Sequence, residues 1–323
     1  MNESSLIDLI LKGDLRALSK AITLIESKRE DHRKYADKII SKIYKYTGNS
    51  VRYGITGPPG VGKSTFIDRF GSMLAKKGDK IAVLAVDPSS HISGGSILGD
   101  KTRMEELSKL DNVYIRPSPS STSLGGVTYN TREAIFLCEA AGYNRVIIET
   151  VGTGQSEINI ANMVDIIILL QLPNAGDDLQ GIKKGIIEIA DIIAINKVSG
   201  NNITKAKNSK KYLEFALSIT KSKYSNWSVP ILLIDALENK GIDSLLAKSN
   251  EFISFLKEEN LFSKNRKLQN IKWFDDLIES KLKMFFFNNK VIKEMYNKYR
   301  EMILNGELTP SKAAEILFSS FIK

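Results

Sequence analysis

Apolar and polar positions follow two kinds of spacing along the chain, and the spacing changes at two places. Up to about residue 50, apolar residues recur at helical spacing, as in LIDLILKGDLRALSKAITLIES (residues 6–27). In the middle of the chain, short apolar runs alternate with amphipathic stretches. The helical pattern then returns, and the turn NGELTP predicts a last helix that begins near Pro310. These changes predict a helical N-terminal extension over 1–50, an α/β domain over 51–255 and a C-terminal helical region over 256–323.

Seven apolar runs in the middle of the chain predict β-strands. In chain order they are VRYGITG, KIAVLAVD, NVYIRP, RVIIET, DIIILLQL, DIIAINK and VPILLID. Several are apolar nearly throughout, which is typical of strands that are covered on both faces. The stretches TFIDRFGSMLAKKG, TREAIFLCEAAG, GIKKGIIEIA and AKNSKKYLEFALSI predict the helices between them. This alternation indicates an α/β fold with a doubly wound, mostly parallel sheet.

Composition narrows the class of protein. Of the 323 residues, 42% are apolar, and the longest apolar runs are too short to span a membrane. The start MNESSLIDLI lacks the basic and apolar regions of a secretion signal, and Cys138 is the single cysteine, so we expect a cytoplasmic protein. The net charge of +9 is dispersed among acidic residues, which favours a solvated surface over nucleic-acid binding.

The most informative motif is GPPGVGKST, which matches Gly-x-x-x-x-Gly-Lys-Ser/Thr between a predicted strand and a predicted helix. Its glycines let backbone N–H groups turn towards phosphates, and the helix N-terminus adds partial positive charge. We expect Lys63 to reach the β- and γ-phosphates of a nucleotide and the Ser64 hydroxyl to bind Mg²⁺. The predicted phosphate-binding residues are Gly57, Pro58, Pro59, Gly60, Val61, Gly62, Lys63, Ser64 and Thr65.

Carboxylates that complete a magnesium site are expected at the ends of the neighbouring strands. Asp87 ends one predicted strand, Glu149 ends another, and Asp100 lies in the glycine-rich stretch SGGSILGDKTRM. Gly152 would bring a backbone N–H towards a γ-phosphate, as switch segments do. Gln155 either positions a water molecule or caps the next helix, and the sequence leaves both roles open.

Taken in order, GPPGVGKST, VDPSS, SGGSILGDKTRM, ETVGTGQSE, LPNAGDDLQGIKKGI and NK resemble the motifs of the MeaB/MMAA family of P-loop GTPases, also called ArgK or LAO/AO transport system kinases. The resemblance covers nearly the whole chain. It implies a P-loop NTPase fold of the G3E/SIMIBI type, GTP and GDP as ligands, Mg²⁺, and a homodimer with helical extensions at both ends. It also implies a partner, an adenosylcobalamin-dependent acyl-CoA mutase, chiefly methylmalonyl-CoA mutase. GTP hydrolysis would be coupled to cofactor loading and protection of that mutase.

The resemblance also implies roles for single residues. Ser64, Asp100 and Glu149 would bind Mg²⁺, with Asp87 behind them, and Arg103 would lie beside the first switch. ETVGTGQSE resembles the second switch. NAGDDLQGIKKG resembles a third switch, in which Asp177 and Lys183 would respond to the partner, although a solvated helix start explains the acidic residues there equally well. The candidates for catalysis are Lys63, Glu149, Gln155 and Lys183.

The base-binding motif departs from the family pattern. That pattern reads Asn-Lys-x-Asp, in which the Asp accepts hydrogen bonds from guanine, but here Asn196 and Lys197 are followed by Ser199. A later loop that commonly reads Ser-Ala reads Asp235-Ala236. We expect all five residues to surround the base. Asp235 either supplies the missing carboxylate or only caps the next turn; near the amino edge of the base it would retain GTP, and near the six-position it would favour ATP.

Other functions fit parts of the sequence. A nickel-insertion GTPase commonly carries His or Cys clusters, whereas His32, His91 and Cys138 lie far apart in this chain. A kinase is supported only by the older family name. An NTPase with relaxed base specificity, or a nucleotide-binding module that does not hydrolyse, is supported only by the altered base motif.

Overall fold

The computed structural model describes residues 3–27, 29–87, 103–119, 126–150, 160–173, 184–220 and 222–322. Its strands are β1 (Val51–Thr56), β2 (Ile81–Asp87), β3 (Val113–Pro119), β4 (Arg145–Glu149), β5 (Ile166–Gln171), β6 (Ile192–Ile195) and β7 (Ile231–Leu233). Its α-helices are α1 (Glu3–Leu11), α2 (Leu15–Glu26), α3 (Glu30–Ile43), α4 (Lys63–Lys76), α6 (Gly126–Ala140), α8 (Lys184–Ile189), α9 (Asn202–Ser218), α10 (Ile242–Glu258), α11 (Leu261–Asn288), α12 (Lys290–Leu304) and α13 (Pro310–Ile322).

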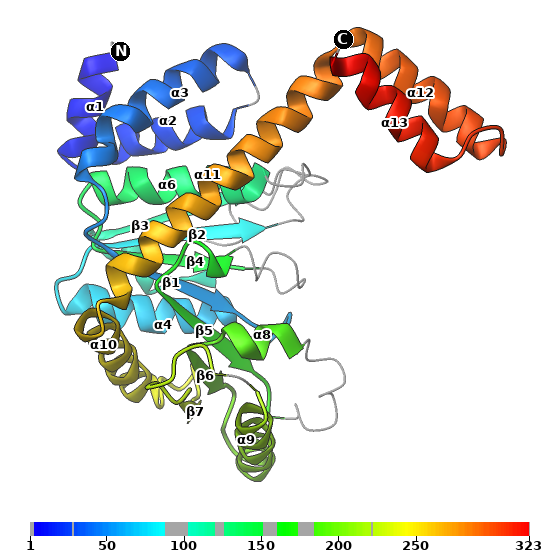
Figure 1. The fold of residues 1–323 in the computed structure, drawn as a ribbon. Coiled ribbons are helices and arrows are strands. Elements are labelled where there is room, and N and C mark those ends of the chain that lie inside the picture. The colour runs from blue at the N-terminus through cyan, green and yellow to red at the C-terminus, as the bar shows by residue number, and fades with distance from the viewer. Residues whose placement is uncertain are drawn as a thin grey trace. The chain divides into compact units, whose positions relative to one another are not determined.

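The strands form one sheet in the order β3-β2-β4-β1-β5-β6-β7, and every pair is parallel. All seven predicted strands are present, so the predicted α/β class with a parallel, doubly wound sheet is confirmed (Figure 1). Since all the strand pairs are parallel, the C-terminal ends of the seven strands lie at the same edge of the sheet. The P-loop motif and the predicted base-binding residues follow three of these strands.

Both faces of the sheet are covered by helices. Alternate residues of β1, such as Tyr53 and Ile55, belong to a buried cluster that includes Phe66 and Phe70 of α4 and Phe252 of α10. On the opposite face, β5 and β6 pack against α8 and α9. Burial on both faces explains why the strands read as continuous apolar runs rather than alternating ones.

The N-terminal helices add a layer over α6 (Figure 1). Helix α2 buries Leu18, Ile22 and Ile25 along one side, at the spacing that the amphipathic pattern predicts. Both α2 and α3 contact α6, which in turn contacts β2 and β4. The helical pattern at the start of the chain therefore reflects a face buried against a helix of the α/β domain.

The chain divides into two compact units, residues 1–266 and 267–323. In the second unit, Phe286, Ile292 and Leu317 form a small core between α12, α13 and the end of α11. Helix α13 begins at Pro310, as the turn motif predicted. Within the described residues, no helix is both long and apolar enough to cross a membrane.

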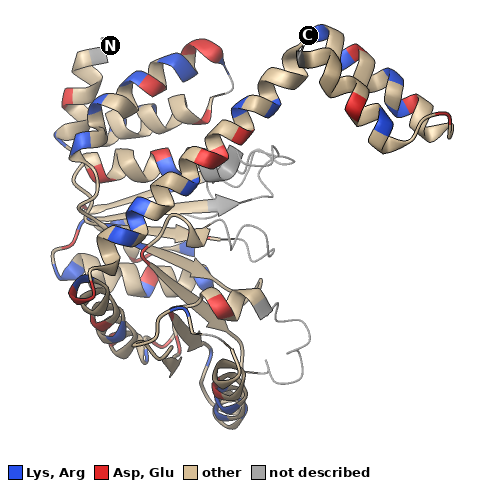
Figure 2. Ribbon diagram, viewed as in Figure 1, with Lys and Arg blue, Asp and Glu red and all other residues tan. Residues whose placement is uncertain are grey.

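Basic and acidic side chains are interspersed along the helices of both units (Figure 2). Lys34 pairs with Glu30 on α3, and Lys312 pairs with Glu315 on α13. Each of these pairs is exposed and lies within one helical turn, so each adds little to stability. This distribution agrees with a solvated, lysine-rich surface.

Candidate functional site: a phosphate loop beside two base-binding loops

The loop between β1 and α4 has a backbone that its glycines make possible, because Gly57, Gly60 and Gly62 all have positive φ. Gly57 has a φ of 145°, and a Cβ at that position would lie 2.4 Å from the carbonyl oxygen of Leu170 on β5. Gly62 has a φ of 96° and directly precedes α4. The first N–H groups of α4 have no intrahelical acceptor, so they are available to an anion that binds at the loop.

Lys63, the first residue of α4, has its ammonium group over this loop. Its Nζ donates to the carbonyl oxygens of Gly57, at 2.8 Å, and Pro58, at 3.2 Å. Positive charge and the helix N-terminus thus meet at one place. This is the arrangement that the sequence predicts for binding a polyphosphate.

Ser64 and Glu149 meet across adjacent elements. The Ser64 hydroxyl donates to Glu149 Oε1 at 3.1 Å, and Glu149 lies opposite Ile55 in the register of β1 and β4. A hydroxyl oxygen and a carboxylate oxygen therefore converge beside the phosphate loop. Such oxygen ligands are the kind that Mg²⁺ prefers.

The other predicted metal and switch residues are placed only in part. The backbone of Asp87 ends β2, two residues beyond the pair between Ala85 and Glu149, so it lies at the same edge as Glu149. Arg103 is exposed. The predicted residues that lie outside the described part of the chain are Asp100, Gly152, Gln155, Asp177 and Lys183.

Asn196 connects the phosphate loop with the two predicted base-binding loops. Its Nδ2 donates to the Val61 carbonyl oxygen at 2.8 Å, and its Oδ1 accepts from the Ala236 N–H at 2.9 Å. This approach requires Gly62, because a Cβ there would lie 2.8 Å from Asn196 Nδ2. Lys197, with a φ of 62°, reaches back so that its Nζ donates to the Gly60 carbonyl oxygen at 2.7 Å.

Ser199 and Asp235 occupy neighbouring loops. The N–H of Val198 donates to the Ile234 carbonyl oxygen at 3.1 Å. Ser199 directly follows Val198 in the chain, and Asp235 directly follows Ile234. Asp235 Oδ1 accepts from the N–H of Glu238 at 3.1 Å. The cap on the following turn, one of the two roles that the sequence left open for Asp235, is therefore present.

Sequence reasoning missed a pair of threonines at the strand ends. The Thr150 hydroxyl donates to the Thr56 hydroxyl at 2.9 Å, and both side chains are buried. This bond fixes the end of β4, where Glu149 lies, against the end of β1, where the phosphate loop begins. The signal was a threonine at the end of each of the two runs, VRYGIT and RVIIET.

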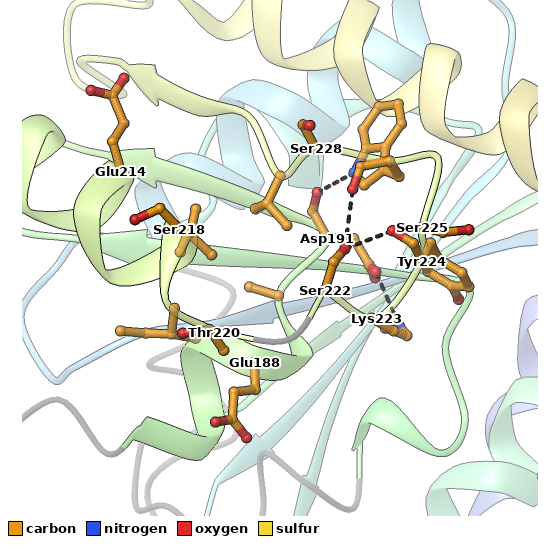
Figure 3. Close-up of a pocket in the computed structure, with 15 residues that line it drawn as sticks. Glu188, Asp191, Glu214, Ser218, Thr220, Ser222, Lys223, Tyr224, Ser225 and Ser228 are labelled. Atoms are coloured by element: carbon orange, nitrogen blue, oxygen red, sulfur yellow. Dashed lines mark hydrogen bonds and ion pairs between the residues drawn. The ribbon is translucent and has the colours of Figure 1, made fainter.

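A separate hollow of about 300 Å³ lies at the opposite edge of the sheet (Figure 3). Its deepest charged group is Asp191, which precedes β6 and accepts from the N–H of Ile167 at 2.8 Å. Burial raises the pKa of the Asp191 carboxyl, and the Lys223 ammonium, 3.0 Å away, opposes that shift. Among the described residues, none that the sequence predicted for the site lines this hollow. The described residues that were predicted for the site, such as Lys63 and Glu149, lie at the other edge of the sheet.

Comparisons with known proteins identify the family of the chain. A family described as "Methylmalonyl Co-A mutase-associated GTPase MeaB" matches residues 18–291. The GTPase ArgK of Escherichia coli (strain K12) is 42% identical over 326 residues, which cover 100% of this chain and 98% of that protein. The mitochondrial methylmalonic aciduria type A homolog of Mus musculus is 41% identical over 322 residues, covering 97% of this chain and 78% of that protein.

A solved structure extends the likeness to the fold. The crystal structure of an LAO/AO transport system kinase has a TM-score of 0.81 and 36% sequence identity, covering 100% of this chain and 99% of that one. The family match spans most of the chain, and the relatives are similar along nearly all of it. This chain therefore belongs to the MeaB family of GTPases.

Proposed function

We propose that this protein is a Mg²⁺-dependent GTPase that serves as a chaperone for an adenosylcobalamin-dependent mutase, methylmalonyl-CoA mutase. The observation that carries the proposal is the convergence of Lys63, Ser64 and Glu149 on one side of a glycine loop at the start of α4. Membership of a family described as mutase-associated supports the choice of partner.

The side chains at the loop fit a magnesium ion. Ser64 and Glu149 present oxygen atoms within hydrogen-bond distance of each other, and both would hold the ion. Asp87 and Asp100 are the further candidates for this site. When bound, Mg²⁺ would neutralise charge on the terminal phosphates.

The chain's own groups would hold and orient the triphosphate. The Lys63 ammonium and the first N–H groups of α4 would bind the phosphate oxygens and favour charge that develops between the β- and γ-phosphates. Asn196 and Lys197 would position the base, because both are fixed to the phosphate loop. We assign Gln155 and Lys183 to the orientation of the attacking water and to the response to the partner.

The coupling to the mutase would run through the segments that follow β4 and β5. Glu149 ends β4 and begins ETVGTGQSE, and NAGDDLQGIKKG follows β5. A segment that binds the γ-phosphate in one nucleotide state and releases it in the other presents two surfaces to a partner. GTP hydrolysis would thereby control cofactor loading and protection of the mutase.

Phosphate release tests the proposal directly. The purified protein is incubated with Mg²⁺ and GTP, with and without methylmalonyl-CoA mutase, and we expect hydrolysis that requires Mg²⁺ and rises with the mutase. Lys63→Ala should remove most triphosphate affinity, whereas Lys77→Ala, which replaces an exposed lysine at the other end of α4, should not. No hydrolysis under any condition would refute the GTPase function, and hydrolysis indifferent to the mutase would refute the chaperone role.

A further inference from the structure

A GTPase must distinguish guanine from the other bases by hydrogen bonds to its edge. Guanine presents two neighbouring donors there, the ring N1–H and the 2-amino group, so its pocket needs a strong acceptor. A site that is built to bond a polar group rejects an analogue without that group more strongly than an apolar pocket does. Ser199 offers one neutral hydroxyl, which both donates and accepts.

Asp235 lies beside the loop that carries Ser199. Its neighbour Ala236 bonds Asn196 through the backbone, and its other neighbour, Ile234, bonds Val198. Asp235 therefore lies between two bonds that tie its loop to the loop of residues 196–199. The same Asn196 side chain contacts the phosphate loop. A nucleotide held by that loop would therefore extend towards the junction of the two loops, which is formed by residues 196–199 and 234–236.

Asp235 has acceptor capacity beyond the bond that caps its own turn. The residue is 4% exposed, and within the described part of the chain its carboxylate accepts one hydrogen bond, from the N–H of Glu238. An ionised carboxylate has about four acceptor positions. Burying a charged group is unfavourable unless donors satisfy it. Two adjacent donors on a guanine edge would fill the remaining positions.

We propose that Asp235 is the residue that specifies guanine. The carboxylate that binds the base would then come from the loop after β7 instead of the loop after β6. Ser199 is small and leaves space for that carboxylate at the junction. This inference rests on the proposed binding of GTP at the phosphate loop. It makes Asp235 both the cap of its own turn and the acceptor for the base.

The substitution Asp235→Asn tests the assignment with little change in shape. Asn retains an oxygen that accepts from the Glu238 N–H, but it places an amide donor where the carboxylate faced the 2-amino group. Xanthine carries an oxygen in place of that amino group. We therefore expect GTP affinity to fall about ten- to a hundredfold and XTP affinity to rise about tenfold or more. Calorimetric titration of GTP and XTP into both proteins measures these changes.

The control replaces another carboxylate of the same turn. The Glu238 side chain pairs with Lys240, and Glu238→Gln should leave the preference for GTP over XTP as it is in the parent. An Asp235→Asn protein that is folded and still ranks GTP above XTP as the parent does would overturn the inference. If the parent binds no GTP, or if Lys63→Ala binds as tightly as the parent, the proposed function fails instead.

A double substitution gives an independent test. Asp235→Ser alone removes the carboxylate and should abolish the preference for GTP over XTP. Adding Ser199→Asp to it returns a carboxylate to the junction from the other loop and should restore that preference. If Asp235→Ser alone retains the preference of the parent, Asp235 does not read the base.

Discussion

Gly62 is the residue on which the phosphate loop and the base-binding loops depend together. Its φ of 96° suits glycine, and a Cβ there would lie 2.8 Å from Asn196 Nδ2. The added carbon would push away the amide that bonds Val61 and Ala236. The requirement at this position is therefore steric as well as conformational.

The substitution Gly62→Ala should weaken nucleotide binding more than it weakens the fold. The control is Gly78→Ala, because Gly78 has a nearly identical φ of 95° but open space where the Cβ would be. Both variants should lose about 1–2 kcal/mol of unfolding free energy from the backbone conformation. GTP titration should show a loss of affinity only for Gly62→Ala, and equal affinities in the two variants would contradict this account.

Local motifs made part of the site predictable. Residues 57–65 could be predicted because the strand, glycine loop and helix are contiguous in sequence, and Glu149 could be predicted because it ends an apolar run that indicates a strand. The contacts of Gly62 with Asn196 and of Thr56 with Thr150 could not, because each joins segments that are distant in the chain. The sequence showed these residues but not their proximity.

At the scale of elements, Arg266 ties the start of α11, which belongs to the unit of residues 1–266, to residues next to the sheet. The Arg266 guanidinium bonds both carboxylate oxygens of Asp165, at 2.8 and 2.6 Å, and the carbonyl oxygens of Gly48 and Ser50. Ser50 in turn donates to Glu139, the buried partner of Arg52. One set of charges thus joins α11, α6, β1 and the residue before β5.

Removing Arg266 should destabilise the protein strongly. Arg266→Ala leaves the buried Asp165 carboxylate without its guanidinium partner, so we expect a loss of about 3–5 kcal/mol of unfolding free energy. Arg29→Ala breaks an exposed pair with Asp31, and its unfolding free energy should stay close to that of the parent. Urea denaturation of both variants measures the difference. Similar losses of unfolding free energy would show that burial does not determine how much each ion pair stabilises the fold.

Stability should also fall in acid because of Glu139. Burial acts to raise the pKa of this carboxyl, but the charge and hydrogen bonds of Arg52, with those of Ser50 and Gly48, outweigh it and bring the pKa below its ordinary 4.5. A carboxyl whose pKa is lower in the folded state stabilises the fold above its unfolded pKa and loses that contribution as the pH falls through the folded pKa.

Glu139→Gln tests this linkage. The variant should be less stable than the parent at neutral pH, and its unfolding free energy should decline less between about pH 5 and pH 3. Glu105→Gln, at an exposed position, should follow the parent. Parallel curves for Glu139→Gln and the parent in urea titrations across that range would refute the assignment.

Whether a segment forms a helix or a strand was more predictable than which other elements it packs against. The apolar runs identified all the strands that the described residues form, because burial on both faces leaves little room for polar residues. The pattern of α1 to α3 showed that one face is buried but not that α6 covers it. Likewise, the polar contacts of Arg266 join residues as far apart as Gly48, and no local pattern marks such a pair.

At the scale of the whole molecule, the unit of residues 267–323 presents an apolar face to solvent. Along α11, Leu268, Ile271, Ile278, Leu282 and Phe285 are all exposed, by 43% to 70%. Successive members are three, four or seven residues apart, with Asp275 at the position between Ile271 and Ile278. This spacing is typical of a helix that packs against another helix along a seam. We propose that a second copy of the chain covers this face in a homodimer.

Charge on that seam should dissociate the dimer. We expect the variant with both Ile271→Glu and Leu282→Glu to sediment as a monomer at concentrations where the parent sediments as a dimer, because each glutamate would be buried without a partner. Ile219→Glu changes an exposed residue at the end of α9 and should leave the parent's behaviour unaltered. A double variant that is still dimeric would place the interface elsewhere.

The two bonds of the Asn196 side chain have a consequence for fidelity. The Asn196 amide bonds Val61 in the proposed phosphate loop and Ala236 in the turn that we propose contacts the purine. An ill-fitting purine that displaces this turn would also shift the loop beneath the terminal phosphate. A wrong nucleotide would then be rejected at two steps. It would bind more weakly, and the molecules that do bind would be hydrolysed more slowly.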